Sequence, residues 1–284
     1  MRLTWRSWPY LLQRSLVAAF DDNCFGIAKG AAYSALLAFF PVLATVATVL
    51  LQARAEFVTR TAQNFLARVL PPGTEELVLE QFKVGGERPV LLPVFAILLS
   101  LWSASRVVAS LIEGFQAAYR IPRSRGILRE AGVTTGLVLL AAAPLVAASA
   151  LILFGAQVEA AVLRWIEVDP LWNPFAWWWR LLSRLGLYAI SFATTVAVTM
   201  ILYYFGPYRR QRWRAVFPGA VIATLFWLVA TGAFGWYVNN LANYNVLYGS
   251  IGTSIALLVW MYLMAAIALV GCEFNAEYER LSRT

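Results

Sequence analysis

The chain alternates between long apolar stretches and short segments that hold most of its charged residues. Six of the apolar stretches contain about 20 residues or more, the length that an α-helix needs to cross the hydrocarbon core of a bilayer. We therefore expect an all-α, polytopic membrane protein built as a bundle of six transmembrane helices. The expected spans cover residues 31–51, 90–112, 131–154, 181–205, 216–238 and 250–272. Together they form a six-helix transmembrane domain over residues 31–272.

The two ends of the chain lie outside this domain. In residues 1–30, Trp8, Leu12 and Leu16 recur at helical spacing and mark one apolar face. This pattern predicts an N-terminal amphipathic helix, which either lies in the membrane interface or packs on the end of the bundle. Residues 273–284 are predicted to form a short polar tail in the cytoplasm.

The charge distribution predicts the orientation of the bundle. The net charge of +8 is compatible with nucleic-acid binding, but the Lys and Arg residues cluster between the apolar stretches. Fourteen of them fall in the segments that six spans place on one side of the membrane, and seven fall on the other side. Cytoplasmic loops are the ones enriched in Lys and Arg. We therefore expect both termini in the cytoplasm and no nucleic-acid partner.

The residue types disfavour an enzyme or a metal centre. The chain has no histidine, which is the usual general base near neutral pH and the commonest metal ligand. Its two cysteines, Cys24 and Cys272, lie near expected cytoplasmic helix ends, where thiols stay reduced. We expect no catalytic residues, no bound metal and no cofactor.

Six segments carry a resemblance to a known family. They are the stretch from Tyr33 to Pro41, the stretch from Leu101 to Arg106, and four further segments at 213–219, 248–252, 260–262 and 271–276. In their order and spacing they resemble the YihY/BrkB family of bacterial inner-membrane proteins, over roughly residues 20–280. The resemblance implies a six-helix bundle in the bacterial inner membrane. Members of that family are linked to virulence, and many carry a ribonuclease BN label that we interpret as a misannotation.

Arg106 is the most informative charge, because it falls inside an expected span. Glu113 lies seven residues later, about two helical turns or roughly 10 Å away, and so shares its helical face. An arginine at that depth either snorkels to the headgroups or lines a polar cavity that contacts a substrate. Glu273 and Asn275, at the expected cytoplasmic end of the sixth span, are the other cavity candidates, and a solvated helix end is the alternative for them.

Prolines and glycines mark expected kinks and close helix contacts. Prolines inside the spans remove backbone hydrogen bonds, and glycines let helix backbones approach or unwind a helix start. The residues concerned are Pro41, Pro144, Pro218, Gly219, Gly249 and Gly252. The pairs Gly26–Gly30 and Gly132–Gly136 also have the four-residue spacing of close packing.

These features favour a non-enzymatic membrane function. The preferred hypothesis is a transporter, or a component that handles lipids of the envelope, with a lipid or small-molecule substrate. The alternative is a membrane scaffold that binds partner proteins without transport, and a ribonuclease ranks third. The lipid bilayer is the expected partner in each case, and homo-oligomerisation stays open.

Overall fold

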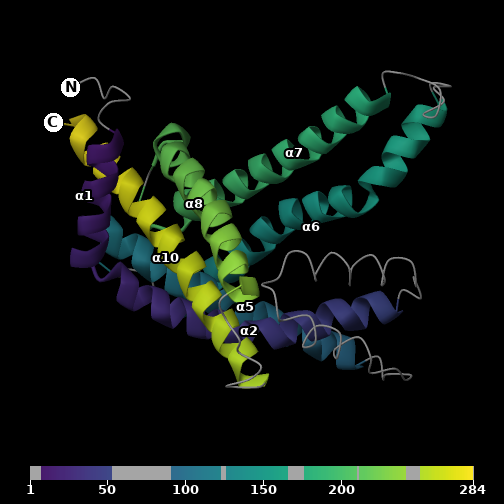
Figure 1. Cartoon of the computed structure of the whole chain (residues 1–284). Coiled ribbons are helices and arrows are strands. Elements are labelled where there is room, and N and C mark those ends of the chain that lie inside the picture. The colour runs from purple at the N-terminus through teal and green to yellow at the C-terminus, as the bar shows by residue number, and fades with distance from the viewer. Residues whose placement is uncertain are drawn as a thin grey trace.

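The computed structural model describes residues 8–52, 91–122, 126–165, 176–209, 211–240 and 250–283. These residues form seven helices, which Figure 1 shows. They are α1 (Trp8–Asp21), α2 (Cys24–Gln52), α5 (Leu91–Ala118), α6 (Ile127–Trp165), α7 (Ala176–Phe205), α8 (Trp213–Asn240) and α10 (Ser250–Arg283).

The expected fold class is confirmed. Within the described residues, α2, α5, α6, α7, α8 and α10 are each long and apolar enough to cross a membrane, and the short α1 precedes them. The helices extend past most of the expected spans. The largest extensions are in α6, which continues past residue 154 to Trp165, and in α10, where residues 273–283 form the last three turns.

The six long helices pack as a closed ring. Each of α2, α5, α6, α7 and α8 contacts the next in chain order, and α10 closes the ring by packing on α8 and α2. α10 also contacts α5 and α1, while α6 and α7 extend away from it side by side (Figure 1). Large apolar side chains such as Phe95, Leu182 and Val229 face outward, as expected for helices surrounded by lipid.

A close contact between two glycines joins α8 to α10. A Cβ atom on Gly219 would lie 2.1 Å from the carbonyl oxygen of Gly271, and one on Gly271 would lie 2.9 Å from that of Gly219. Gly219 therefore has the close-packing role expected of it. Around Gly30, Gly132 and Gly136, in contrast, added Cβ atoms meet no described atom within 4 Å. The close packing expected at these three glycines is wrong within the described part of the chain, where no atom of a neighbouring helix lies next to them.

Two of the prolines lie beside polar groups from a neighbouring helix. Pro218 lies inside α8, and Asn275 of α10 bonds the backbone on either side of it. The Gly219 N–H donates to Asn275 Oδ1 at 2.7 Å, and Asn275 Nδ2 donates to the Val216 carbonyl at 3.0 Å. Pro41 lies inside α2, and its carbonyl accepts a hydrogen bond of 2.7 Å from Ser100 of α5. These bonds tie the proline-containing helices to their neighbours in the ring.

Pro144 and Gly252 are also helical. Pro144 lies inside α6, which changes direction along its length in Figure 1. Gly252 is buried in the first turn of α10, so the helix is wound at this residue. Gly249 lies outside the described residues.

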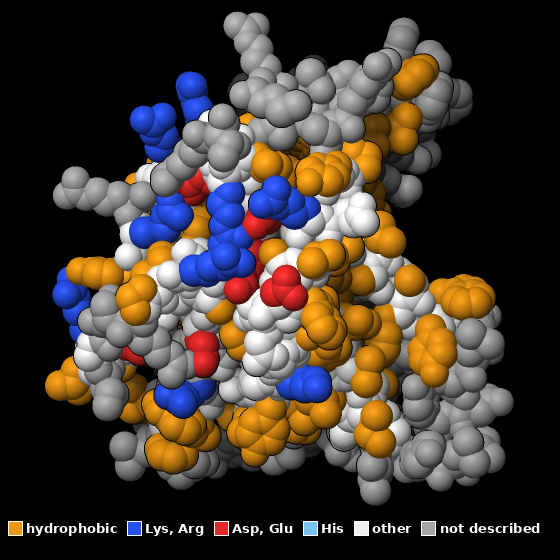
Figure 2. Space-filling model, turned by 90° about the vertical axis from the view of Figure 1, so that its left-hand side faces the viewer, with side chains coloured by type: hydrophobic (Ala, Val, Ile, Leu, Met, Phe, Trp, Pro, Cys, Tyr) orange, Lys and Arg blue, Asp and Glu red, His pale blue; other side chains and the backbone are white. Residues whose placement is uncertain are grey.

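The four basic segments assigned to one side by sequence meet at one end of the bundle, which we call the basic end. Arg14 of α1 bonds Glu277 of α10 at 2.5 Å, and Arg209 bonds Glu279 at 2.6 Å. Figure 2 looks onto this end and shows Lys and Arg side chains gathered over acidic ones.

Arg120 holds the loop that follows α5 against the basic end. It adopts a left-handed φ of 54°, and the Ile121 N–H bonds back to the Gln116 carbonyl at 2.9 Å, which is the pattern of a Schellman cap. Its guanidinium then lies 3.4 Å from Asp22, in the turn that follows α1. The cap therefore holds the end of α5 beside the junction of α1 and α2.

Candidate functional site

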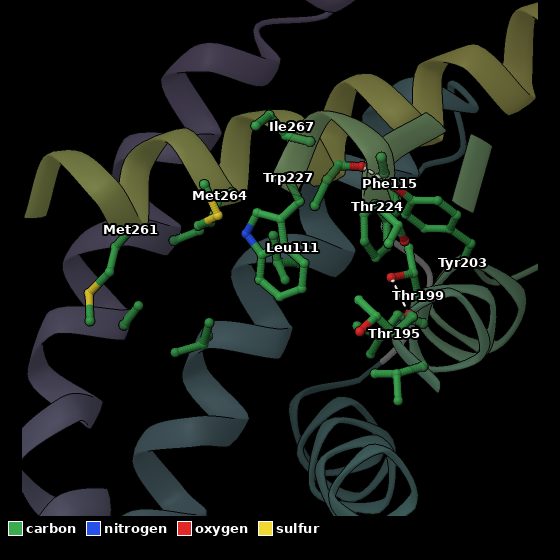
Figure 3. Close-up of a pocket in the computed structure, with 18 of the residues that line it drawn as sticks. Leu111, Phe115, Thr195, Thr199, Tyr203, Thr224, Trp227, Met261, Met264 and Ile267 are labelled. Atoms are coloured by element: carbon green, nitrogen blue, oxygen red, sulfur yellow. Dashed lines mark hydrogen bonds between the residues drawn. The ribbon is translucent and has the colours of Figure 1, made fainter. Parts of the chain in front are cut away.

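A central cavity of about 310 Å³ lies inside the ring. All six long helices contribute to its wall, and Figure 3 shows side chains from several of them pointing into the same space. The labelled residues are Leu111, Phe115, Thr195, Thr199, Tyr203, Thr224, Trp227, Met261, Met264 and Ile267. Each of the six long helices therefore contributes at least one residue to the wall of this cavity.

The wall of this cavity is almost wholly apolar. Its three threonines donate their hydroxyl protons within their own helices, as in the 2.9 Å bond from Thr199 to the Thr195 carbonyl. The Tyr203 hydroxyl donates to the Ala268 carbonyl at 2.5 Å. Met261 and Met264 line one side with flexible, polarisable side chains that adapt to irregular apolar shapes. The cavity therefore suits a hydrocarbon chain better than a charged solute.

None of the four cavity candidates from the sequence lines this space. The signal that could have indicated it is the Thr195–Thr199 pair, four residues apart on α7, opposite a methionine pair three residues apart on α10. Such a signal is weak, because threonine and methionine are common in transmembrane helices that face lipid.

Arg106 instead lines a second pocket, of about 410 Å³, between α5 and α6. The other residues in its wall are Trp102, Ser105, Ala109, Glu130, Ala131, Thr134 and Thr135. A 3.1 Å hydrogen bond between Ser105 and Thr135 joins the two helices at this level. Arg106 is itself exposed at this polar hollow, a position compatible with both the snorkelling and the cavity interpretations.

The remaining candidates lie elsewhere. Glu113 is exposed on α5 and does not line the Arg106 pocket. Glu273 is fully buried and accepts a hydrogen bond from the Cys24 thiol at 3.7 Å. Asn275 is buried at the α8–α10 contact described above. The structure thus separates these three residues from Arg106, and it brings in Glu130, which sequence reasoning missed.

The basic end is a bonded network, in contrast to the Arg106 pocket. Glu277 is buried and forms ion pairs with both Arg14 and Arg280, and Arg280 also donates to the Ala118 carbonyl at 2.7 Å. Arg209 lies over the ring of Tyr119, 4.5 Å from its centroid, and burial raises the pKa of the Tyr119 phenol above its ordinary value. These groups are committed to one another, so they hold α1, α5 and α10 together.

A comparison with protein-family models gives one match, to the family described as virulence factor BrkB, over residues 16–284. The chain belongs to this family. The match covers all six long helices and the last six residues of α1, so the central cavity and the Arg106 pocket both lie within the matched region.

Several curated proteins are similar to this BrkB-family chain. The ribonuclease-like protein YfkH of Bacillus subtilis is 28% identical over 186 residues, which is 64% of each chain. A UPF0761 membrane protein of Tolumonas auensis is 25% identical over 86% of this chain and 77% of its own. Another, from Alkalilimnicola ehrlichii, is 28% identical over 89% of this chain and 55% of its own. The chain thus spans less than two thirds of the Bacillus and Alkalilimnicola relatives. No solved structure matches it.

Proposed function

We propose that this BrkB-family membrane protein handles lipids, binding the hydrocarbon part of an amphiphile in its central cavity and moving it within or across the membrane. The observation that carries the proposal is the apolar cavity lined by residues from all six long helices. A scaffold needs an outer surface for its partners, but it has no need of a cavity that every span helps to line.

The size of the cavity agrees with this proposal. An apolar cavity of about 150 Å³ is enough to bind benzene, and ligand pockets generally measure about 300–1,000 Å³. The central cavity, at about 310 Å³, reaches the lower end of that range and accommodates part of an acyl chain. The favourable free energy comes from close contact between the chain and the cavity wall, because surrounding lipid is itself apolar.

Filling the cavity should weaken lipid binding. Thr199→Phe places an aromatic ring in the cavity from α7, and overpacking of this kind costs about 1–3 kcal/mol. We expect roughly tenfold less phospholipid to be retained by the purified protein, measured by native mass spectrometry. Movement of a fluorescent phospholipid between the leaflets of proteoliposomes should slow in proportion.

Two control variants separate cavity filling from other effects. Ala197→Phe adds the same ring on an exposed face of the same helix, and Thr199→Val keeps the shape but removes a hydroxyl that the proposal does not use. Both should retain lipid as the unaltered protein does. If Thr199→Phe bound and moved lipid normally, the cavity would have no role in function and the scaffold hypothesis would be preferred.

We propose that the basic end faces the cytoplasm. The concentration of arginines from four separate segments at this end supports the assignment. A reporter fused after Thr284, or inserted near Gln211, should report the cytoplasm, whereas one near Gly73 or Asn243 should report the opposite side. Exchange of any position between these two groups would contradict the proposed orientation.

We propose that the chain is not a ribonuclease, although one relative has a ribonuclease-like name. It contains no histidine, and among the described residues no three Cys, Asp or Glu side chains form a group that could hold a metal ion. The purified protein should leave RNA intact with and without Mg²⁺. Cleavage that co-purifies through several steps, and is lost when one carboxylate is changed, would overturn this proposal.

A further inference from the structure

The pocket between α5 and α6 combines two opposite charges with a set of hydroxyl groups. On α5, Trp102, Ser105 and Arg106 follow the spacing of a single helical face. On α6, Glu130 and Thr134 lie one turn apart and line the same space. The pocket shares no residue with the central cavity, so the two are separate sites.

Among the described residues, neither charge in this pocket has an oppositely charged partner. Within the part of the chain that the structure describes, the Arg106 guanidinium and the Glu130 carboxylate form no ion pair, with each other or with another side chain. Both lie in helices that cross the membrane. Charged groups in such helices are stabilised only by a partner or by water. A ligand with complementary charges would stabilise both.

The level of the pocket brings it within reach of lipid headgroups. Thr135, which bonds Ser105, lies eight residues after Ile127, roughly 12 Å along the α6 axis from its start at the basic end. The surrounding surface is lipid-facing, since Trp102 is 65% exposed and Leu128 is 89% exposed. A bilayer lipid is therefore the ligand that this pocket meets at highest concentration.

We propose that the α5–α6 pocket binds the headgroup of a zwitterionic phospholipid of the ethanolamine type. Arg106 presents a planar fork that binds two phosphate oxygens at once, and Glu130 accepts hydrogen bonds from the ammonium group. An anionic headgroup without an amine is repelled by Glu130, and a lone cation is repelled by Arg106. Only a ligand that carries both a negative and a positive charge can pair with Arg106 and Glu130 at the same time.

The hydroxyl groups favour ethanolamine over choline. The Ser105 hydroxyl donates its proton to the Leu101 carbonyl at 2.7 Å, and the Thr134 hydroxyl donates to the Ala131 carbonyl at 3.0 Å. Each oxygen keeps lone pairs and therefore acts toward a ligand as an acceptor. A primary ammonium has three N–H donors for these acceptors, whereas a quaternary ammonium has none.

Native mass spectrometry of the purified protein in mixed micelles tests the proposal. The probes are phosphatidylethanolamine, phosphatidylcholine and phosphatidylglycerol with identical acyl chains. The unaltered protein should retain the ethanolamine lipid in preference to both others. Arg106→Ala should reduce its retention about tenfold, Arg106→Lys should reduce it less, and Glu130→Gln should remove the preference over phosphatidylglycerol.

Arg129→Ala is the matched control, because it removes an exposed arginine that neighbours Glu130 but does not line the pocket. It should leave retention and selectivity unchanged. Equal retention by Arg106→Ala and the unaltered protein, or equal losses in Arg106→Ala and Arg129→Ala, would overturn the proposal. If Arg106→Ala does not fold, Arg106→Lys and Glu130→Gln test the proposal instead. Full lipid retention by Arg106→Lys together with unchanged headgroup selectivity in Glu130→Gln would refute the proposal.

Two further arms identify the source of the headgroup and separate this site from the central cavity. Soluble phosphoethanolamine should compete poorly with the lipid, and competition at equal concentration would refute recognition of a membrane lipid. Thr199→Phe should lower total lipid retention but leave the headgroup preference intact. Loss of preference in Arg106→Ala with a normal Thr199→Phe would support this site even if the lipid-handling role of the central cavity fails.

Discussion

Replacing Gly219 with valine should prevent the bundle from folding normally. The first added carbon would lie 2.1 Å from the Gly271 carbonyl oxygen, which belongs to backbone and cannot rotate away. α8 and α10 would have to separate, which would also break the bonds from Asn275 to the α8 backbone. We expect a loss of at least about 3 kcal/mol of stability, seen as a large fall in the thermal midpoint of the detergent-solubilised protein.

Gly232→Val provides the control for this substitution. Gly232 lies on an exposed face of the same helix, and an added Cβ there meets no described atom within 4 Å. Removing a helical glycine without a clash is neutral or slightly favourable. The control should therefore unfold at or slightly above the temperature of the unaltered protein. Similar losses in both variants would contradict the close-packing role of Gly219.

The sequence predicted the number and positions of the long helices, because hydropathy reports the thickness of the membrane directly. It did not predict their ends. α5 continues past residue 112 to Ala118 and ends at the left-handed Arg120, whose cap depends on local backbone geometry. Apolar runs mark where a helix meets lipid, whereas a helix that continues into water leaves no mark in hydropathy.

The candidate site was only partly predictable, for a related physical reason. Arg106 was found because a charge contrasts with an apolar span. Its companion Glu130 was missed because it lies on the next helix, and spacing along a chain relates only residues of one helix. The central cavity was missed because a side chain that faces a cavity and one that faces lipid have the same polarity, so no contrast separates them.

The glycines and Asn275 illustrate the same limit. Gly132 and Gly136 have the spacing of a close contact, but that spacing only permits an approach, and none of the helices that the structure describes approaches them. Gly219 contacts Gly271, which lies far along the chain on another helix. The partner of such a residue is a property of the tertiary fold.

Substitution of Asn275 should lower the stability of the fold more than that of any other polar residue. Its side chain hydrogen-bonds backbone groups on both sides of Pro218. Its side chain is 1% exposed. Asn275→Ala leaves the Gly219 N–H and the Val216 carbonyl without these partners, at a cost of about 1–3 kcal/mol for each buried group. Asn275→Asp keeps the acceptor for Gly219 but turns a charged oxygen toward the Val216 carbonyl, which repels it.

The aspartate variant should therefore be the less stable of the two near neutral pH. Asn275 is buried, and an uncompensated buried charge costs about 3–5 kcal/mol. Protonating the introduced carboxyl restores a donor for the Val216 carbonyl and removes the charge. The penalty of Asn275→Asp should thus shrink as the pH is lowered, while that of Asn275→Ala should change little.

Thermal midpoints measured from pH 5 to pH 8 test this difference. Ser282→Asp is the control, because it adds one negative charge to an exposed position of the same helix. It should lower the midpoint only slightly at any pH. If Asn275→Asp were as stable as the unaltered protein at pH 8, the carboxylate would have to be hydrated or paired there. Asn275 would then belong to a polar cavity, as the sequence first suggested, and would not be a buried link between α8 and α10.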